Sequence, residues 1–139
     1  MLTFKQKRAI HTNALPKQID QWWRLSTSLT KALKQHYSCF SVEVLFEGIH
    51  QSEWERVVLL HGDNMPIVFA VSLLPCKWLN HPLWRRVRHL KNKPLGETLF
   101  ASHLVRRQII SYFHLGKRVG RWSRFEYRKT YLDLVEIFL

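Results

Sequence analysis

Apolar residues that alternate with largely polar ones recur along most of this chain after residue 40, and this spacing constrains the fold more than any other feature. Phe40, Val42, Val44 and Phe46 are an example. Because successive side chains of a β-strand point to opposite faces, such alternation predicts a strand with one buried face. The pattern predicts six strands, at about residues 40–47, 53–61, 67–74, 103–114, 120–128 and 131–139.

Short polar connections separate several of these strands. Residues 62–64 (Gly-Asp-Asn) and 128–130 (Arg-Lys-Thr) are turn signals that predict hairpins. Strands that follow one another in hairpins form an antiparallel sheet. We therefore predict an α+β fold with a six-stranded antiparallel sheet, in which residues 17–139 are a single domain and residues 1–16 a flexible basic arm.

Helices are expected at the start of the domain and in its middle. Residues 17–23 have apolar residues at helical spacing, and a second helix is predicted to begin near Ser26 or Thr27, either of which can cap it, and to end near residue 37. Residues 76–100 are expected to be irregular or helical. Their basic part, residues 84–91, has three open interpretations: a solvated helix face, a segment that steers an anionic substrate, or a nucleic-acid contact.

The charge balance is strongly basic, with 22 Lys and Arg against 10 Asp and Glu and a net charge of +12. Such a field favours anionic partners, and composition alone leaves open nucleic acid, an anionic membrane surface or a small polycarboxylate. No apolar run approaches the roughly 20 residues that span a bilayer, and no signal-peptide core stands out. We expect a cytoplasmic protein, with weak contact to a membrane surface left open.

The residues that most often bind metals have no recognisable ligand spacing in this chain. Cys39 and Cys76 do not form a CxxC pair, and the eight histidines show no HxxxH or HExxH spacing. We therefore expect two reduced thiols and no metal site.

A charged residue interrupts an otherwise apolar strand face at two positions. Arg56 does so in the second predicted strand and Glu136 in the last. Their neighbours on those faces are Trp54, Val58 and Leu60 for the arginine, and Leu132, Leu134 and Phe138 for the glutamate. An ionised group on a core face is costly unless it is paired or binds a ligand.

Two interpretations of this pair stay open from the residues alone. Arg56 and Glu136 could form a buried salt bridge with each other, or lie near a sheet edge where they reach water. Alternatively they could lie in a pocket over the sheet, where Arg56 binds a carboxylate and Glu136 a hydroxyl. Arginine suits the first role because its planar fork matches a carboxylate.

Four short motifs carry a resemblance to a known family. They are Trp22-Trp23 followed by Ser28-Leu29-Thr30-Lys31, Trp54-Glu55-Arg56 at the start of a strand, Pro94-Leu95-Gly96 followed by Leu99-Phe100, and the terminal Glu136-Ile137-Phe138-Leu139. In this order and spacing the chain resembles the bacterial chorismate–pyruvate lyases from about Asp20 to Leu139.

The resemblance implies a fold, an activity and a site. The fold is a six-stranded antiparallel sheet with helical flaps over a buried ligand pocket. The activity is the elimination of pyruvate from chorismate to give 4-hydroxybenzoate for ubiquinone, by a monomer without metal or organic cofactor. Arg56 and the main-chain N–H groups of Leu29 and Leu95 are implied to bind the carboxylate, and Glu136 the 4-hydroxyl, either as a base or as an orienting group.

Other positions depart from the family pattern or extend it. Val71 stands where familiar members carry a basic residue, which puts substrate affinity or product release in question. A double arginine before a serine becomes Arg121-Trp122-Ser123. Arg106 and Arg107 point to opposite faces of one strand, and the family pattern favours Arg107 as a pocket residue. Two other function classes stay open: a non-catalytic small-molecule-binding domain of the same fold, and a basic nucleic-acid-binding module.

Overall fold

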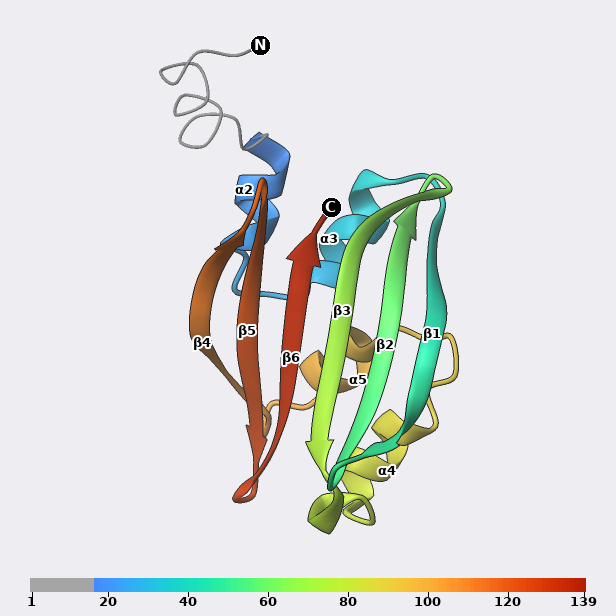
Figure 1. The fold of residues 1–139 in the computed structure, drawn as a ribbon, viewed down its shortest axis with the longest axis vertical. Helices are drawn as coiled ribbons and strands as arrows, with labels where there is room; N and C mark the ends of the chain where they lie inside the picture. Colours follow the sequence, from blue (N-terminus) through green and yellow to red (C-terminus); the bar gives the residue numbers. More distant parts are fainter. Residues whose placement is uncertain (1–16) are drawn as a thin grey trace.

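The computed structural model describes residues 17–139, which form a six-stranded sheet with short helices on one side (Figure 1). Neighbouring strands are antiparallel, in the order β1-β2-β3-β6-β5-β4. The predicted α+β class and all six strands are confirmed, whereas the predicted arm lies outside the described residues. The strands are β1 (Phe40–His50), β2 (Glu53–Gly62), β3 (Met65–Pro75), β4 (Arg106–Leu115), β5 (Arg118–Tyr127) and β6 (Thr130–Phe138).

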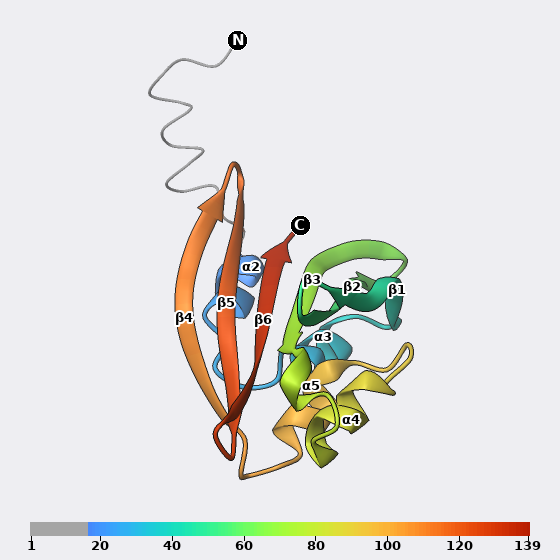
Figure 2. The ribbon, with the colours of Figure 1, turned by 60° about the horizontal axis from the view of Figure 1, so that its bottom comes forward.

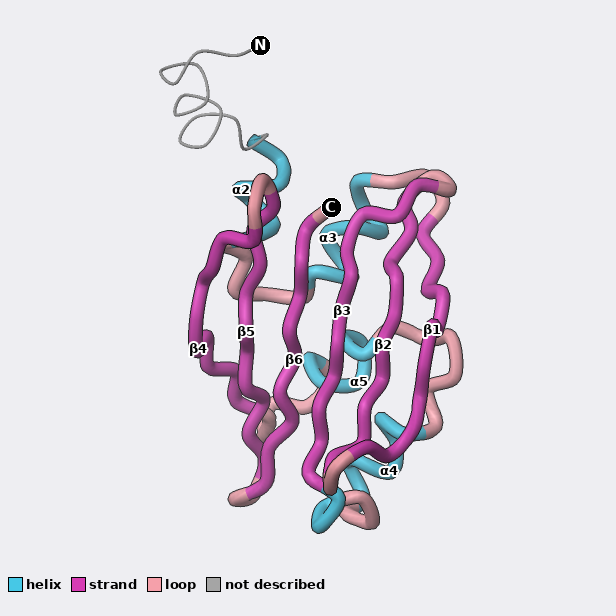
Figure 3. The backbone as a smooth tube through the Cα atoms, viewed as in Figure 1, coloured by secondary structure: helices cyan, strands magenta, loops and turns pink. Residues whose placement is uncertain are grey.

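The helices cover one face of the sheet, which we call the inner face; the opposite one is the outer face. Figure 3 shows the strands in front and the helices behind them, and Figure 2 shows α3, α4 and α5 together on one side. Within residues 17–139, no helix is long and apolar enough to cross a membrane. The helices are α2 (Lys17–Trp23), α3 (Leu29–His36), the 3-10 helix η1 (Cys76–Trp78), α4 (Pro82–Arg88) and α5 (Leu95–Phe100).

Alternation along the strands produces the core. In β2, every second residue from Trp54 to Leu60 is buried, and the residues between them are half-buried. Two groups of buried apolar residues pack between the inner face and the helices. One contains Trp84 of α4 and Phe125 of β5, and the other contains Leu33 of α3.

The turns agree with the sequence at both predicted places. Residues 63–64 and 128–129 have positive φ, as do residues 51–52 between β1 and β2. Pairs of residues with positive φ form the tight hairpin turns whose twist matches that of the flanking strands. The hairpins at residues 62–64 and 128–130 are therefore confirmed.

The start of α3 differs from the prediction. Ser26 or Thr27 was expected to cap this helix, but the cap is Ser28, whose Oγ accepts a hydrogen bond from the Lys31 N–H at 3.2 Å. The main-chain carbonyls of Ser26 and Thr27 accept long hydrogen bonds from Arg107 instead. The chain therefore turns into the helix one or two residues later than expected, because the preceding loop is held against the sheet.

The basic segment at residues 84–91 includes most of α4. This helix buries Leu83, Trp84 and Val87 against the sheet, and Trp84 Nε1 donates to Thr130 Oγ1 at 2.7 Å. Arg85 and Arg86 lie on its exposed side. The segment has the arrangement expected for a solvated helix face.

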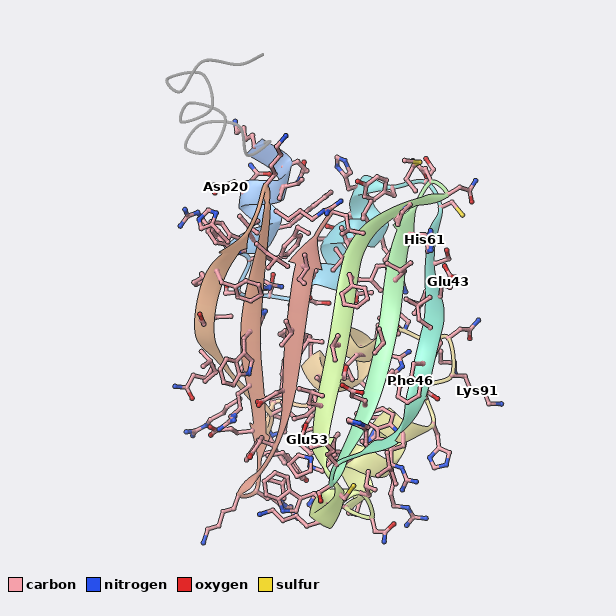
Figure 4. All side chains as sticks on the ribbon, in the orientation of Figure 1. Asp20, Glu43, Phe46, Glu53, His61 and Lys91 are labelled. Carbon is pink, nitrogen blue, oxygen red and sulfur yellow. The ribbon has the colours of Figure 1, made fainter. Side chains whose placement is uncertain are left out.

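Strand β1 departs from simple alternation. A β-bulge between Val44 and Phe46 shifts the register, so that Val44 lies opposite Val58 but Phe46 lies opposite Val57. An extra residue of this kind moves every later side chain to the other face. The prediction that Phe46 shares a face with Phe40, Val42 and Val44 is therefore wrong: its ring lies over Gly48, and it is 46% exposed (Figure 4).

Candidate functional site

A cavity of about 50 Å³ lies between the inner face and the first turns of α3 and α5. Most of its lining is apolar, from residues such as Val58, Ala70 and Phe125. Four charged residues also line it, namely Arg56, Arg107, Arg121 and Glu136. Pockets with an apolar wall and a few convergent polar groups are typical ligand sites.

Arg56 lies at the β2 side of the cavity, and its side chain is 1% exposed. Its Nη2 donates to the main-chain oxygens of Lys91 at 3.0 Å and Lys93 at 2.7 Å, and its Nε lies 3.2 Å from Glu47 Oε1. The side chain of Lys91 points away from the sheet (Figure 4), so only its backbone takes part. Burial lowers the pKa of Arg56, and Glu47 partly opposes that shift. Within residues 17–139, no hydrogen bond uses Nη1 of Arg56.

Glu47 reaches Arg56 because of the bulge in β1. Without the extra residue, Glu47 would share the outer face with Glu43, which contacts His61 there at 2.8 Å. The shifted register puts Glu47 opposite Arg56. Sequence reasoning missed Glu47, because alternation alone assigns it to the wrong face.

Glu136 lies at the other side of the cavity, on β6, and is 4% exposed. Arg121 Nε donates to Glu136 Oε1 at 2.8 Å, and Arg107 Nη2 lies 3.7 Å from the same oxygen. Among the described residues, Glu136 Oε2 accepts no hydrogen bond. The described residues thus hold the carboxylate through one oxygen and provide no donor for the other.

Arg121 is the charged residue that sequence reasoning did not assign to the site. It is 1% exposed, and its Nη1 donates to the main-chain oxygens of Trp22, Trp23 and Leu25 at 3.1, 3.3 and 2.6 Å. It therefore caps the end of α2 while it holds Glu136. The sequence signal is weaker than for Arg56, because the strand face that Arg121 shares with Val119 and Phe125 also contains the polar Ser123.

Arg56 and Glu136 do not pair with each other. They lie on the two strands that flank β3, where Arg56 is opposite Ser72 and Glu136 is opposite Ala70. Two strand spacings and two residues along the strand put their Cα atoms about 12 Å apart. Each has its own partner, so the buried salt bridge between them is not found, and neither residue is on an edge strand.

The first residues of α3 and α5, Leu29 and Leu95, also line the cavity. The N–H groups of a first helical turn have no partner within the helix, and they carry partial positive charge. Gly96 lets the two helix starts approach, because a Cβ there would lie 3.1 Å from Thr30 Oγ1 and 3.3 Å from Ser28 Oγ. A salt bridge between Lys34 and Glu97 joins the two helices on the outside.

Arg107 and Val71 lie on opposite faces of the sheet. Arg107 lines the cavity with a side chain that is 9% exposed, whereas Arg106 is exposed. Val71 is paired with Val57 and Val135, and its position along the strand places it on the outer face. The sheet therefore separates Val71 from the cavity. Within the described part of the chain, no group of three or more His, Cys, Asp or Glu side chains could hold a metal ion.

Comparisons with known proteins agree on one family. The model of the family described as chorismate lyase matches residues 3–139. The chain is 31% identical to the probable chorismate pyruvate-lyase of Aromatoleum aromaticum, with 79% of this chain and 67% of that protein covered. It is 30% identical to the chorismate pyruvate-lyase of Shigella sonnei, with 91% and 85% covered. For a relative from Marinobacter nauticus, at 38% identity, the chain spans about half of that protein's length.

Proposed function

The chain belongs to the chorismate lyase family, and we propose that it eliminates pyruvate from chorismate to form 4-hydroxybenzoate. The observation that carries this proposal is the pair of buried charges of opposite sign in one cavity, each held by its own partner. A guanidinium and a carboxylate about 12 Å apart at their Cα atoms suit a flat ligand with a carboxylate at one end and a hydroxyl at the other.

We place the ring carboxylate at Arg56. The Nη1 group has no protein acceptor among residues 17–139, and it is the donor that this role requires. The N–H groups of Leu29 and Leu95, at the two helix starts that line the cavity, would add donors to the same carboxylate. A hydrogen bond to a charged group is worth about 1.5–3 kcal/mol, which is enough to orient a small acid.

We place the 4-hydroxyl at Glu136 Oε2, the carboxylate oxygen to which no described residue donates. Arg121 keeps the carboxylate in place through Oε1, which lies 2.8 Å from its Nε. A carboxylate held in this way accepts a hydrogen bond from a substrate hydroxyl without moving.

Elimination of pyruvate from chorismate requires a correctly oriented substrate more than strongly acidic or basic catalytic groups. The bond between ring carbon C3 and the ether oxygen breaks, and C4, which bears the hydroxyl, loses a proton. The released enolpyruvate takes up a proton and becomes pyruvate. The ring becomes aromatic, which supplies the driving force, so the protein contributes mainly by fixing the substrate. Glu136 is beside the C4 position, where it orients the hydroxyl and is the candidate base.

The test is to incubate the purified protein with chorismate and to measure pyruvate and 4-hydroxybenzoate together. We expect equal amounts of both from the wild-type protein, and at least about a hundredfold loss of kcat/KM in Glu136→Gln and Arg56→Gln. Circular dichroism and a thermal melt would show that the variants fold. Glu126→Gln and Arg118→Gln, at exposed positions of β5, are matched controls that should keep full activity.

Three results would contradict the proposal, and each points elsewhere. Tight binding of 4-hydroxybenzoate without any pyruvate would indicate a non-catalytic binding domain. Salt-sensitive binding of DNA or RNA without turnover would indicate a nucleic-acid-binding module. Full activity of Glu136→Gln or Arg56→Gln would refute the roles of those residues.

The proposal has finer parts that rest on the family resemblance. We propose that the enzyme works without metal or organic cofactor, as a monomer in the cytoplasm, and that its product is used for ubiquinone. Turnover that is unchanged by a metal chelator supports the first part, and light scattering on the purified protein tests the second. Ubiquinone content in cells that depend on this gene product tests the last.

A further inference from the structure

The charges around the cavity do not balance. Three arginines line it, but within the part of the chain that the structure describes only two carboxylates contact them, Glu136 in the lining and Glu47 behind Arg56. Glu47 lies 3.2 Å from Arg56, and Glu136 Oε1 lies 2.8 Å from Arg121. Arg107 lies 3.7 Å from that same Oε1, which already accepts the shorter bond. Among residues 17–139, Arg107 is therefore the arginine of the cavity whose carboxylate is held more closely by another arginine.

The other neighbours of Arg107 orient it but do not neutralise it. Ser123 Oγ accepts from its Nε at 3.2 Å and from its Nη2 at 3.0 Å. The rings of Phe100 and Phe125 have their centroids 5.9 and 5.6 Å from its guanidinium carbon. The remaining acceptors are main-chain oxygens of residues 25–27, at 3.3 to 3.5 Å. These contacts fix the orientation of the guanidinium, whose negatively charged neighbour among the described residues is the Glu136 carboxylate that it shares with Arg121.

Burial has a cost for this group. Burial and the neighbouring Arg121 lower the pKa of Arg107 to about 10, while Glu136 opposes the shift. The guanidinium is thus still charged at neutral pH. A buried charge whose counter-ion is distant and shared keeps part of its desolvation cost, and an anionic ligand group beside it would offset that cost.

The proposed substrate has an anionic group that fits this position. Chorismate carries a second carboxylate on its enolpyruvyl group, which is attached to the ring carbon next to the one bearing the hydroxyl. With the hydroxyl at Glu136, the enolpyruvyl group lies beside Glu136. Among the described residues, Arg107 is the cationic group at that side whose one carboxylate contact is long and shared with Arg121. We propose that Arg107 binds the enolpyruvyl carboxylate of chorismate and so selects a dianionic substrate over the monoanionic product; this inference rests on the proposed function.

The contact at Arg107 is lost when the products form. When the ether bond breaks and pyruvate leaves, the carboxylate that neutralised Arg107 leaves with it. 4-Hydroxybenzoate keeps only the contacts at Arg56 and Glu136. Arg107 should therefore contribute to the affinity for chorismate and not to the affinity for 4-hydroxybenzoate, and these two affinities can be measured separately.

The experiment compares Arg107→Gln with Arg106→Gln, its exposed neighbour on the other face of β4. Initial rates of pyruvate release give kcat and KM for chorismate, and calorimetry gives Kd for 4-hydroxybenzoate. We expect Arg107→Gln to raise KM by about tenfold to a hundredfold, the loss of one hydrogen-bonded charge contact. Its Kd for 4-hydroxybenzoate should change less than about twofold, and Arg106→Gln should change neither value by more than that.

Arg107→Lys keeps the positive charge but loses the planar guanidinium with its paired N–H donors. Because this change is more conservative, it serves as a second variant in case Arg107→Gln does not fold. We expect it to raise KM less than Arg107→Gln does, because part of the electrostatic attraction is kept. An equal loss of affinity for chorismate and 4-hydroxybenzoate in both Arg107 variants would show a structural role and refute the proposal. An unchanged KM in Arg107→Gln would refute it as well. Absence of turnover in the wild-type protein would instead refute the proposed function itself.

Discussion

The two ends of the cavity hold a buried charge in different ways. At the Arg56 end, the counter-ion is Glu47 on the edge strand β1, and the Glu47 side chain is 32% exposed. Two main-chain oxygens also accept hydrogen bonds from Arg56. At the Glu136 end, two arginines with side chains only 1% and 9% exposed surround one carboxylate that is itself 6% exposed. The first end is partly screened by water, whereas the second is enclosed by protein.

This difference indicates which end is part of the framework. The Arg56 end ties residues 91–93, just before α5, to the sheet, so it positions one side of the cavity wall. The Glu136 end also holds the end of α2, through the three main-chain oxygens that accept from Arg121. We therefore expect charge removal at the Glu136 end to affect both stability and activity, and charge removal at Glu47 to affect little besides the ligand.

The largest effect is expected for Arg121→Met. This change removes the short ion pair to Glu136 and the cap of α2, and it leaves a buried carboxylate with one distant partner. Breaking a buried pair by removing one member costs about 3–5 kcal/mol. Unfolding in urea would measure this loss, and Arg124→Met is a matched control. Arg124 pairs with Asp133 at 2.8 Å with 30% of its side chain exposed, so its loss should cost about 0–1 kcal/mol. Equal costs for both variants would contradict the comparison.

The parts of this site that the sequence predicted are those on regular strands. Arg56 and Glu136 could be predicted because apolar residues alternate without a break around each of them. Counting every second residue therefore assigns both side chains to the buried face of the sheet. Arg121 did not stand out in this way, because Ser123 is on the same strand face, and it was noted only as a departure from a family motif. Glu47 did not follow, because the bulge at Val44 and Phe46 reverses parity and nothing in the local sequence indicates it. The cap of α3 was missed because it depends on contacts from β4, far along the chain.

A smaller effect is expected for Glu47→Gln, at the solvated end of the cavity. The removed carboxylate is 32% exposed, and although Arg56 is 1% exposed, the glutamine amide oxygen can still accept from it, so the free energy of unfolding should fall by about 0–1 kcal/mol. Arg56 would lose a competing carboxylate, so 4-hydroxybenzoate should bind about twofold to fivefold more tightly, a gain below about 1 kcal/mol. Glu43→Gln is the matched control, because Glu43 lies on the same strand but contacts His61 on the outer face. Weaker binding in Glu47→Gln, or a loss of stability as large as that of Arg121→Met, would contradict the difference between the two ends.

The smallest effect is expected for Val71→Arg, which restores the basic residue that familiar family members carry. Val71 has the outer-face parity of Val57 and Val135, so a guanidinium there is separated from the cavity by the sheet. We expect KM for chorismate to change by less than about twofold, through the long-range field alone, and this change should disappear when salt is raised from about 0.15 M to 0.5 M. Val57→Arg, on the neighbouring strand of the same face, should show the same small and salt-sensitive change. A tenfold fall in KM that is specific to Val71→Arg and persists in high salt would mean that position 71 reaches the ligand. In that case the inner face would not contain the whole binding site.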